Sequence, residues 1–290
     1  MSKKILRLDG KVAIVTGASQ GLGQYLALAL AAEGARVVLA ARNRERLQLV
    51  RDHIEREGGT AVAVPVDLQR EEDCERMISA TLDAFGRIDQ LVLNAGAATY
   101  GKLEELQGFS SIRNSMNVNF FGAAYPTFLA IKEIIATKGT IAYVTSGAGH
   151  LPMAGYLGYT TSKHAMNGFF EALRLEMYPH DVCVLAINPG DMFSDDGAGR
   201  SVLLPEGTEL KVDLSVKRKN DIQRKPASIV AAKCLEAIVA RKREVDLSPT
   251  IQKVGTVLRA VVPTVVDQRI YEKTARMRSA FADLERPRSA

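Results

Sequence analysis

Short apolar runs alternate with longer amphipathic segments along most of the chain. Runs of β-branched and aliphatic residues bounded by glycine or polar residues are typical of buried strands, and apolar residues recurring every three or four positions are typical of helices. Strands are predicted at 11–16, 36–41, 60–66, 88–94, 140–145, 182–187 and 244–247. Helices are predicted at 21–33, 45–57, 71–85, 111–137 (irregular near Gly122 and Pro126), at a segment carrying Tyr159, and at 225–242.

Continuous apolar strands separated by helices predict a parallel sheet covered on both faces, that is, an α/β doubly wound fold. We expect one catalytic domain over residues 8–250 and a helical C-terminal extension over 251–290. In the extension, apolar residues recur at helical spacing and are interrupted by Lys253 and Arg259; they are Ile251, Val254, Val257, Leu258, Val261 and Val262. Such a stripe suits a membrane surface, a neighbouring subunit or closure of a substrate pocket, and packing on its own protein is the commonest case. We expect it to extend a subunit interface or to cover the substrate pocket, since an exposed stripe of this size favours aggregation or membrane binding.

Composition narrows the class of protein. The 290 residues are 47% hydrophobic and 24% charged, with no apolar run long enough to span a bilayer and no signal-peptide pattern at the start, which favours the cytoplasm. Cys74, Cys183 and Cys234 are widely spaced without metal-ligand register, so we expect reduced thiols and no metal site. The net charge of +5, without basic residues interleaved with aromatics, gives no indication of nucleic-acid binding.

A glycine-rich turn, from Thr16 to Gly23, lies directly between the first predicted strand and helix. Glycines let a backbone turn tightly and approach a pyrophosphate, and the following helix N-terminus presents free N–H groups to the anion. Glycines alone are a weak signal, but this strand–turn–helix context favours nucleotide binding.

A possible acid–base pair is Tyr159 and Lys163, which lie four residues apart and therefore on one face of a helix. A nearby positive charge favours phenolate and lowers the pKa of a tyrosine. Ser146 follows the predicted strand 140–145, where α/β proteins place their chemistry. This spacing alone is also a common chance pattern on helices, so its interpretation depends on the other motifs.

The ordered motifs resemble the short-chain dehydrogenase/reductase family over about residues 8–250. They are Thr16-Gly-x-x-x-Gly-x-Gly23, Asn94-Ala-Gly96, Asn119, Ser146, Tyr159-x-x-x-Lys163 and Pro189-Gly190. The resemblance implies a Rossmann-type fold and a compact member of the family, since the extended branch normally has glycine where Gln20 stands.

The resemblance also implies roles for the matched residues. Tyr159 would exchange a proton with the substrate oxygen, Ser146 would hydrogen-bond that oxygen, and Lys163 would hold the nicotinamide ribose. Asn119 would bind a water that continues the proton relay, although a helix-breaking structural asparagine is the alternative. Implied cofactor-binding residues are Gly17, Ser19, Gln20, Gly21, Leu22, Gly23, Ala41, Arg42, Asp67, Leu68, Asn94, Ala95, Gly96, Tyr159, Lys163, Pro189, Gly190 and Ser194. Asp67 and Leu68 would contact the adenine ring, and for Asp67 the simpler alternative is a helix cap.

The end of the second strand indicates which cofactor is used. Enzymes that use NAD usually place an acid there to bind the ribose 2′-hydroxyl, whereas this chain has Ala41 followed by Arg42. A guanidinium binds a 2′-phosphate bidentately, and Arg44 and Arg46 add positive field. We therefore expect NADP(H) as the cofactor. The alternative is that Arg42 only caps the start of a helix in a charged segment. Cells keep that pool largely reduced, so reduction of a carbonyl is the expected direction.

The substrate is less well indicated. Residues 191–225 are polar and aperiodic, and in this family such a segment is the substrate lid. Ser194 stands where the family often has a threonine at the nicotinamide, and Lys217-Arg-Lys219 is interpreted as a solvated face in preference to an anion clamp. The tail resembles reductases of hydroxysteroids, retinoids and sphingoid ketones, which implies a hydrophobic carbonyl substrate.

Two functional hypotheses follow from these motifs. The first is an NADP(H) oxidoreductase, and the second is a catalytically silent NADP(H)-binding sensor with the same fold. A sensor would not need Ser146, Tyr159 and Lys163 together, so the enzyme is favoured. Members of the family commonly pair through the two long helices that here begin near Ser111 and Gly158, which implies a homodimer or homotetramer. Leu129, Phe169, Phe170 and Leu173 are the apolar candidates for that contact.

Overall fold

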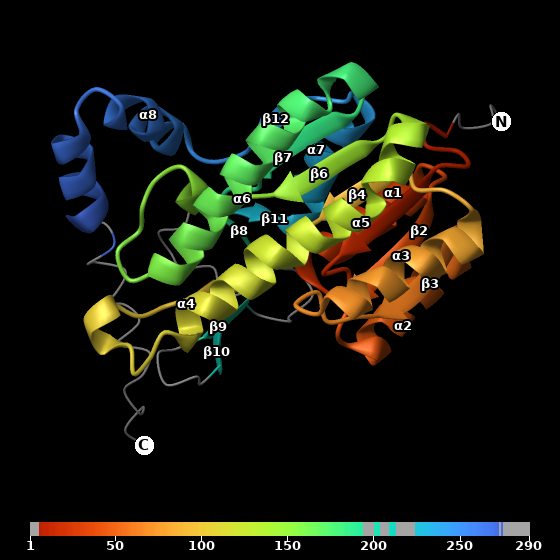
Figure 1. The fold of residues 1–290 in the computed structure, drawn as a ribbon, viewed down its shortest axis with the longest axis horizontal. Helices are drawn as coiled ribbons and strands as arrows, with labels where there is room; N and C mark the ends of the chain where they lie inside the picture. The colour runs from red at the N-terminus through yellow and green to blue at the C-terminus, as the bar shows by residue number, and fades with distance from the viewer. Residues whose placement is uncertain (1–5, 194–199, 204–208, 213–223, 273, 275–290) are drawn as a thin grey trace.

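The computed structural model of the chain describes residues 6–193, 200–203, 209–212, 224–272 and 274. Its centre is a parallel sheet of seven strands in the order β12-β7-β6-β4-β1-β2-β3 (Figure 1). These strands are β1 (Val12–Thr16), β2 (Arg36–Ala41), β3 (Thr60–Pro65), β4 (Gln90–Leu93), β6 (Thr140–Val144), β7 (Cys183–Asn188) and β12 (Glu244–Asp246). The predicted doubly wound α/β fold is confirmed, and the predicted bounds of these strands agree within two residues.

Helices cover both faces of the sheet because each presents one apolar stripe to it. The first face packs against α1 (Gly21–Ala32), α2 (Arg44–Arg56) and α7 (Ala227–Val239). The second face packs against α3 (Glu71–Phe85), α5 (Gly122–Thr137) and α6 (Leu157–Glu176), which lie side by side in Figure 1. On α2, for example, Leu47, Val50 and Ile54 are buried, and the Asn43 side chain caps the helix by accepting from the Arg46 amide.

The long helical region before β6 is broken where the sequence suggested irregularity. It consists of α4 (Ser110–Ser115), a π-helical segment η2 (Met116–Phe121) and then α5. A π-helical turn inserts an extra residue into the hydrogen-bond ladder and is frequent at functional sites. The irregularity therefore precedes Gly122, while Pro126 is accommodated in the first turns of α5.

Several short elements were not predicted. They are β5 (Ala98–Thr99), β8 (Met192–Phe193), β9 (Arg200–Leu203), β10 (Glu209–Val212), β11 (Lys225–Pro226) and the single turns η1 (Leu103–Glu105), η3 (Gly147–Gly149) and η4 (Tyr178–His180). β8 pairs with β11, so the two ends of the segment 191–225 meet, and β9 pairs with β5 just beyond β4. Strand β9, within the segment predicted as a lid, therefore lies beside the loop after β4. Ser194 and Lys217–Lys219 lie outside the described residues.

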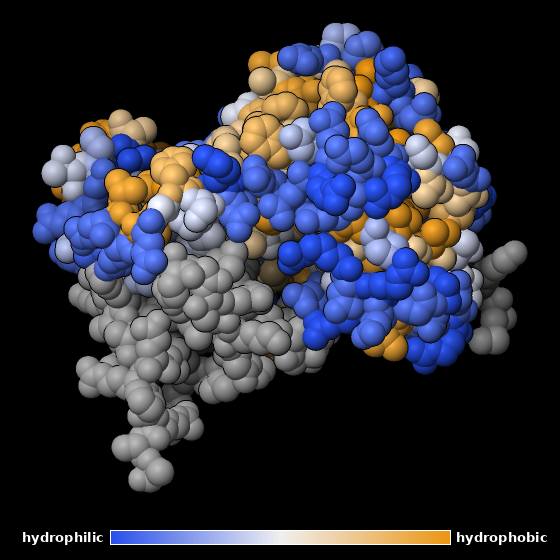
Figure 2. Space-filling model, turned by 60° about the horizontal axis from the view of Figure 1, so that its bottom comes forward, coloured by the Kyte–Doolittle hydropathy of each residue, from blue (hydrophilic) through white to orange (hydrophobic). Residues whose placement is uncertain are grey.

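The C-terminal extension begins with α8 (Thr250–Arg259), and residues 263–272 are also helical. The predicted stripe is exposed within one chain: Ile251 has 78% of its surface exposed and Val257 has 70%. Figure 2 shows hydrophobic side chains on the left-hand lobe, which carries α8 in Figure 1. All six residues of the stripe are exposed, so packing on the described part of its own chain does not cover them. That the stripe extends a subunit interface or covers the substrate pocket stays a prediction. No helix of the described part is long and apolar enough to cross a membrane.

The cysteines do not pair with one another. Cys74 and Cys234 are buried and Cys183 is half-buried, all as free thiols. Burial raises the pKa of Cys74 and of Cys234 to about 12, which leaves both thiols unreactive at neutral pH. Both side chains therefore pack in the core.

Asp89 is a buried carboxylate that ties the start of β1 to the start of β4. It accepts hydrogen bonds from both sides of the Arg87 guanidinium (2.7 and 2.8 Å), from the Lys11 ammonium (3.0 Å) and from the Val12 amide (3.0 Å). Burial alone would raise the pKa of Asp89, but these donors outweigh it and hold the pKa below its ordinary value.

Replacing Asp89 with Asn should therefore destabilise the protein by about 1–3 kcal/mol, because the charge-assisted bonds are lost. A carboxylate whose pKa is lowered by folding stabilises the folded protein at pH values above its unfolded-state pKa. This stabilisation is lost as the pH falls through the folded-state pKa. Urea unfolding from about pH 6 to about pH 3 should show the difference between wild type and variant shrinking toward acid. The exposed Asp83→Asn is the control; a difference that stays constant across this range would contradict the assignment.

Candidate active site

The turn after β1 is locked to the end of β4. The Thr16 hydroxyl oxygen accepts from the amides of Asn94 (2.9 Å) and Ala95 (3.1 Å), and the Asn94 side-chain amide donates to the Thr16 carbonyl (3.1 Å). Gly17 has φ of +67°, and a Cβ there would lie 2.9 Å from the Asn94 amide nitrogen. A Cβ on Gly23 would overlap the Gly17 carbonyl oxygen. Close approach of neighbouring groups requires glycine at both positions, and the positive φ of Gly17 is a further reason there.

The N-terminus of α1 opens at this turn. Gly21 begins the helix with φ of +56°, Leu22 is buried, and Gln20 precedes the helix without capping it through its side chain. Ser19 is half-buried beside them. The N–H groups of the first turn of a helix are suited to binding an anion such as a pyrophosphate.

Arginines line the next loop, after β2. Ala41 is buried, whereas Arg42, Arg44 and Arg46 are exposed at the start of α2. The Arg46 guanidinium donates to the Gln20 side-chain oxygen, so α2 contacts the glycine turn directly. The sequence indicated only a general positive field for Arg46, and no sequence pattern indicated its contact with Gln20.

The loop after β3 is fixed by its own hydrogen bonds. The Asp67 carboxylate accepts from the Gln69 amide (3.1 Å), and the Asp67 amide donates to Asp73 (2.9 Å). Bonds from the Arg76 guanidinium and then from the Asp67 amide hold the pKa of Asp73 below its usual value. The Leu68 side chain is buried against Gly122, so a contact from Leu68 to an adenine ring would have to come from its backbone.

Asn119 is fully buried in the π-helical segment η2 and joins three elements. Its side-chain oxygen accepts from the Ala97 amide (2.8 Å), and its side-chain nitrogen donates to the Ala97 carbonyl (2.9 Å) and to the Ser162 hydroxyl (2.9 Å). Ser162 in turn donates to the Tyr159 carbonyl (2.8 Å). Both side-chain amide hydrogens of Asn119 are used, so a water would have to donate its hydrogen bond to an oxygen atom of Asn119. Sequence reasoning missed Ser162, whose only signal was a hydroxyl one position before Lys163.

Lys163 is buried, with 3% of its surface exposed, beneath the first turn of α6. Its ammonium donates to the Val144 carbonyl at the end of β6 (2.8 Å) and lies 5.8 Å from the centre of the Tyr159 ring. A Cβ on Gly96 would lie 3.0 Å from the Asn119 side-chain oxygen and 3.6 Å from the Lys163 ammonium. The structure therefore brings Gly96, Asn119, Tyr159 and Lys163 together.

Ser146 follows β6 and begins the short turn η3. Its hydroxyl oxygen accepts from the Ala148 amide (3.2 Å), which leaves the hydroxyl hydrogen to donate to a ligand. Asn167 on α6 accepts from Thr145 (2.7 Å) and donates to the Gly149 carbonyl (2.9 Å), which fixes this turn against α6. Ser146 and Tyr159 consequently lie on two segments that are held to each other.

The loop after β7 contains Pro189 and Gly190. Gly190 has φ of +65°, and a Cβ there would lie 2.6 Å from the Leu247 carbonyl oxygen. The chain after β12 is thus packed directly on this loop. The predicted site residues among the described residues lie at the carboxyl ends of strands, as Ala41 does, on the loops that follow these strands, or on the helix segments beside those loops.

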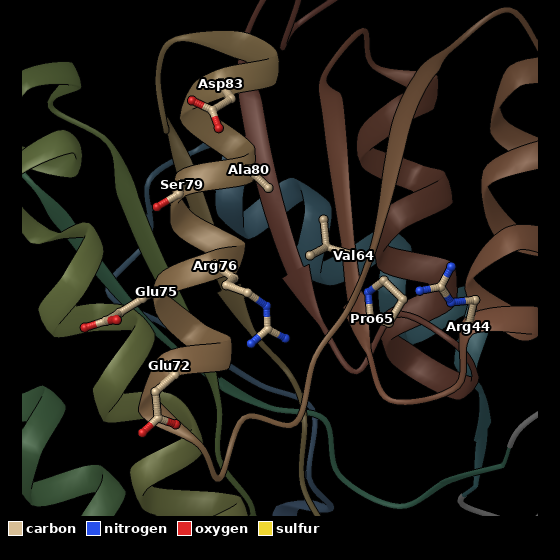
Figure 3. Close-up of a pocket in the computed structure, with 9 residues that line it drawn as sticks. All are labelled: Arg44, Val64, Pro65, Glu72, Glu75, Arg76, Ser79, Ala80 and Asp83. Atoms are coloured by element: carbon tan, nitrogen blue, oxygen red, sulfur yellow. The ribbon is translucent and has the colours of Figure 1, made fainter.

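A separate hollow lies at the edge of the sheet, between β3 and α3 (Figure 3). Its volume is about 720 Å³, and its lining residues are Arg44, Val64, Pro65, Glu72, Glu75, Arg76, Ser79, Ala80 and Asp83. Figure 3 shows Arg76 extending from α3 toward Pro65, with Arg44 on the other side. The hollow is open and contains none of the predicted catalytic side chains, so it is a surface groove near the arginines of α2.

A doubly wound sheet with a glycine turn at its switch point, beside a buried lysine and a tyrosine, defines a dinucleotide-binding oxidoreductase fold. Residues 11–198 match the sequence profile described as short chain dehydrogenase, and the chain belongs to that family. The family resemblance of the motifs is thereby confirmed.

Individual relatives agree with this membership. The chain is 34% identical over 268 residues to "11-beta-hydroxysteroid dehydrogenase-like 4A" of Arabidopsis thaliana, covering 91% of this chain and 85% of that protein. It resembles the structure of an alcohol dehydrogenase from Thermococcus sibiricus complexed with 5-hydroxy-NADP, with a TM-score of 0.69, 25% identity and coverage of 81% and 95%. A metagenomic short-chain oxidoreductase in complex with NADP gives a TM-score of 0.67, 29% identity and coverage of 84% and 99%.

Proposed function

We propose that this chain is an NADP(H)-dependent reductase that converts a hydrophobic ketone or aldehyde to an alcohol. The observation that carries the proposal is the grouping of Tyr159, Lys163 and Asn119 around Gly96, with Ser146 on the adjoining turn. The cofactor supplies the hydride when it is bound. The glycine turn, the N-terminus of α1 and Arg42 are the groups that would hold its phosphates.

The chemistry of these side chains suits reduction of a carbonyl. The Ser146 hydroxyl donates to the substrate oxygen, and the Tyr159 phenol delivers the proton that this oxygen needs as it becomes an alcohol. The Lys163 ammonium, held by the Val144 carbonyl, favours the phenolate that remains after this transfer. Names of relatives such as hydroxysteroid dehydrogenase support a hydrophobic, polycyclic substrate class.

Removing the Tyr159 hydroxyl tests the mechanism. Tyr159→Phe keeps the ring and removes the proton donor, so turnover of NADPH with hydrophobic ketones should fall by roughly a thousandfold. NADPH binding, measured by fluorescence titration, should survive. Tyr178→Phe is the control because Tyr178 is 85% exposed after the end of α6.

A Tyr159→Phe variant with near-normal turnover would refute this mechanism. A wild-type protein that binds NADPH but reduces no ketone in a broad panel would instead support the catalytically silent sensor. The two measurements therefore separate the enzyme from its alternative.

Cofactor preference is tested at the end of β2. Replacing Ala41 with Asp and Arg42 with Ser adds repulsion toward a 2′-phosphate and removes a charge-assisted contact. The ratio of kcat/KM for NADPH to that for NADH should fall by roughly a hundredfold. Arg56→Ser at the other end of α2 should leave the ratio unchanged. A wild-type preference for NADH would show that the interpretation of this loop is wrong.

Assembly completes the proposal. Phe170 is fully buried and stacks on Tyr143 at 4.3 Å, so it belongs to the core of its own chain and was wrongly included among the interface candidates. On the outer face, Phe121 is 37% exposed and Phe128 is 72% exposed. The two residues are seven positions apart, about two helical turns, which places them on the same side of the helix. An exposed aromatic face of this kind supports a homodimer or homotetramer through α5 and α6. A monomer by light scattering at micromolar concentration would contradict this part.

A further inference from the structure

The chain that leads from β12 into the C-terminal extension contacts the active-site loops at positions where only glycine leaves room. A Cβ on Gly190, after β7, would lie 2.6 Å from the Leu247 carbonyl oxygen and 3.0 Å from the Ser248 Cα. A Cβ on Gly147, directly after Ser146, would overlap the side-chain amide of Gln252. The chain from β12 into α8 therefore lies against the loops after β7 and β6 in turn, and Figure 1 places α8 beyond the carboxyl ends of these strands.

Three hydrogen bonds fix this approach. The Leu247 amide donates to the Asn188 carbonyl (2.8 Å), the Ser248 amide to the Asp246 carboxylate (2.8 Å), and the Lys253 ammonium to the Asp246 carbonyl (2.7 Å). One turn into α8, a Cβ on Gly255 would be in van der Waals contact with the Leu151 side chain at 3.6 Å. The first turns of α8 are thus held to the body of the protein, although their outer face is exposed.

Gln252 is the polar side chain that this arrangement places beside Ser146. It is half-buried, and its backbone groups bond to the Pro249 carbonyl (2.9 Å) and to the Thr256 hydroxyl (3.1 Å) within α8. Its side-chain amide has no hydrogen-bond partner within the part of the chain that the structure describes. A primary amide offers two donor hydrogens and an acceptor oxygen, all of which are left for a ligand.

We propose that Gln252 determines substrate specificity by hydrogen-bonding a second oxygen of the substrate, close to the carbonyl that is reduced. This inference rests on the proposed function. Ser146 binds the reacting oxygen, and the Gln252 amide lies over the very next residue, Gly147. A second oxygen bound by Gln252 would therefore lie near the reacting oxygen, and α-dicarbonyls and α-hydroxyketones, which carry an oxygen on the neighbouring carbon, are the substrate class that fits. A primary amide does not ionise at neutral pH and is no acid–base catalyst, so Gln252 recognises the substrate and takes no part in proton transfer.

A pair of matched ketones tests this assignment. Benzil has two adjacent carbonyls, and deoxybenzoin has a methylene in place of one of them. Gln252→Met keeps the length of the side chain and removes its hydrogen bonds, so kcat/KM with benzil should fall by roughly tenfold. With deoxybenzoin it should change by less than about twofold. Comparing variant with wild type for each ketone cancels their different intrinsic reactivity. Gln268→Met, on an exposed part of the same extension, is the matched control.

A double-mutant cycle tests the contact itself. Gly147→Ala places a methyl where the Gln252 amide lies and should lower kcat/KM with benzil in the wild-type background. In a Gln252→Ala background the overlap is absent, so the same Gly147→Ala change should have a clearly smaller effect. NADPH titration of every variant shows whether the nucleotide site is still folded.

Equal losses with benzil and deoxybenzoin in Gln252→Met, or additive effects in the cycle, would overturn the inference. A wild-type protein that binds NADPH and reduces neither ketone nor any other in a broad panel would contradict the proposed function, and this inference with it. The first result leaves the reductase assignment standing, so the two failures are distinguishable.

Discussion

The burial of the Lys163 ammonium is the constraint on which the site depends. A charged group away from water is costly unless hydrogen bonds replace its hydration. Here the Val144 carbonyl accepts from it at 2.8 Å, at the end of a central strand. Gly96 lies beside the ammonium: a Cβ there would be in ordinary contact with the Lys163 ammonium at 3.6 Å, and at 3.0 Å it would crowd the Asn119 side-chain oxygen. The glycine therefore makes room for Asn119 next to Lys163. The first turn of α6, and with it Tyr159, is consequently fixed relative to two neighbouring strands.

Glycines that allow close approach recur around the carboxyl edge of the sheet. Gly17 and Gly23 let the turn after β1 close on Asn94, Gly147 admits Gln252, and Gly190 admits the chain after β12. At each point backbone or a side-chain amide occupies the space that a Cβ would need. The glycines therefore serve close approach between loops, and the hydrogen bonds of Thr16 and Asn119 hold the loops in place. A cofactor that binds here would meet a largely preformed surface, which limits the ordering that binding requires.

Much of this could be predicted from the sequence because it depends on local pattern. Continuous apolar runs identified the parallel strands, and the motif spacing identified the residues that the sheet brings together. Other features depend on partners distant in sequence. The bonds from Asn119 to Ala97 and Ser162 arise from a π-helical turn that no periodicity indicates. Phe170 was an apolar helical residue like its neighbours, and only the stacking on Tyr143 places it in the core.

The C-terminal extension shows most clearly what the spacing of apolar residues cannot predict. Its apolar spacing predicted a helix correctly, but spacing cannot tell whether an apolar stripe faces its own chain or an outside partner. The informative residue proved to be Gln252, a polar residue within that stripe. Its position became visible only once α8 was placed against Gly147.

Replacing Lys163 with Met tests the central claim most directly, which is that the buried ammonium serves chemistry more than stability. Removing a buried charge while keeping an unbranched chain is often neutral or stabilising, so the midpoint of thermal unfolding should stay the same or rise. NADPH-dependent turnover should fall by roughly a thousandfold and NADPH should bind more weakly, with the exposed Lys233→Met as the control. Near-normal turnover, or loss of activity only in step with loss of folding, would contradict this account.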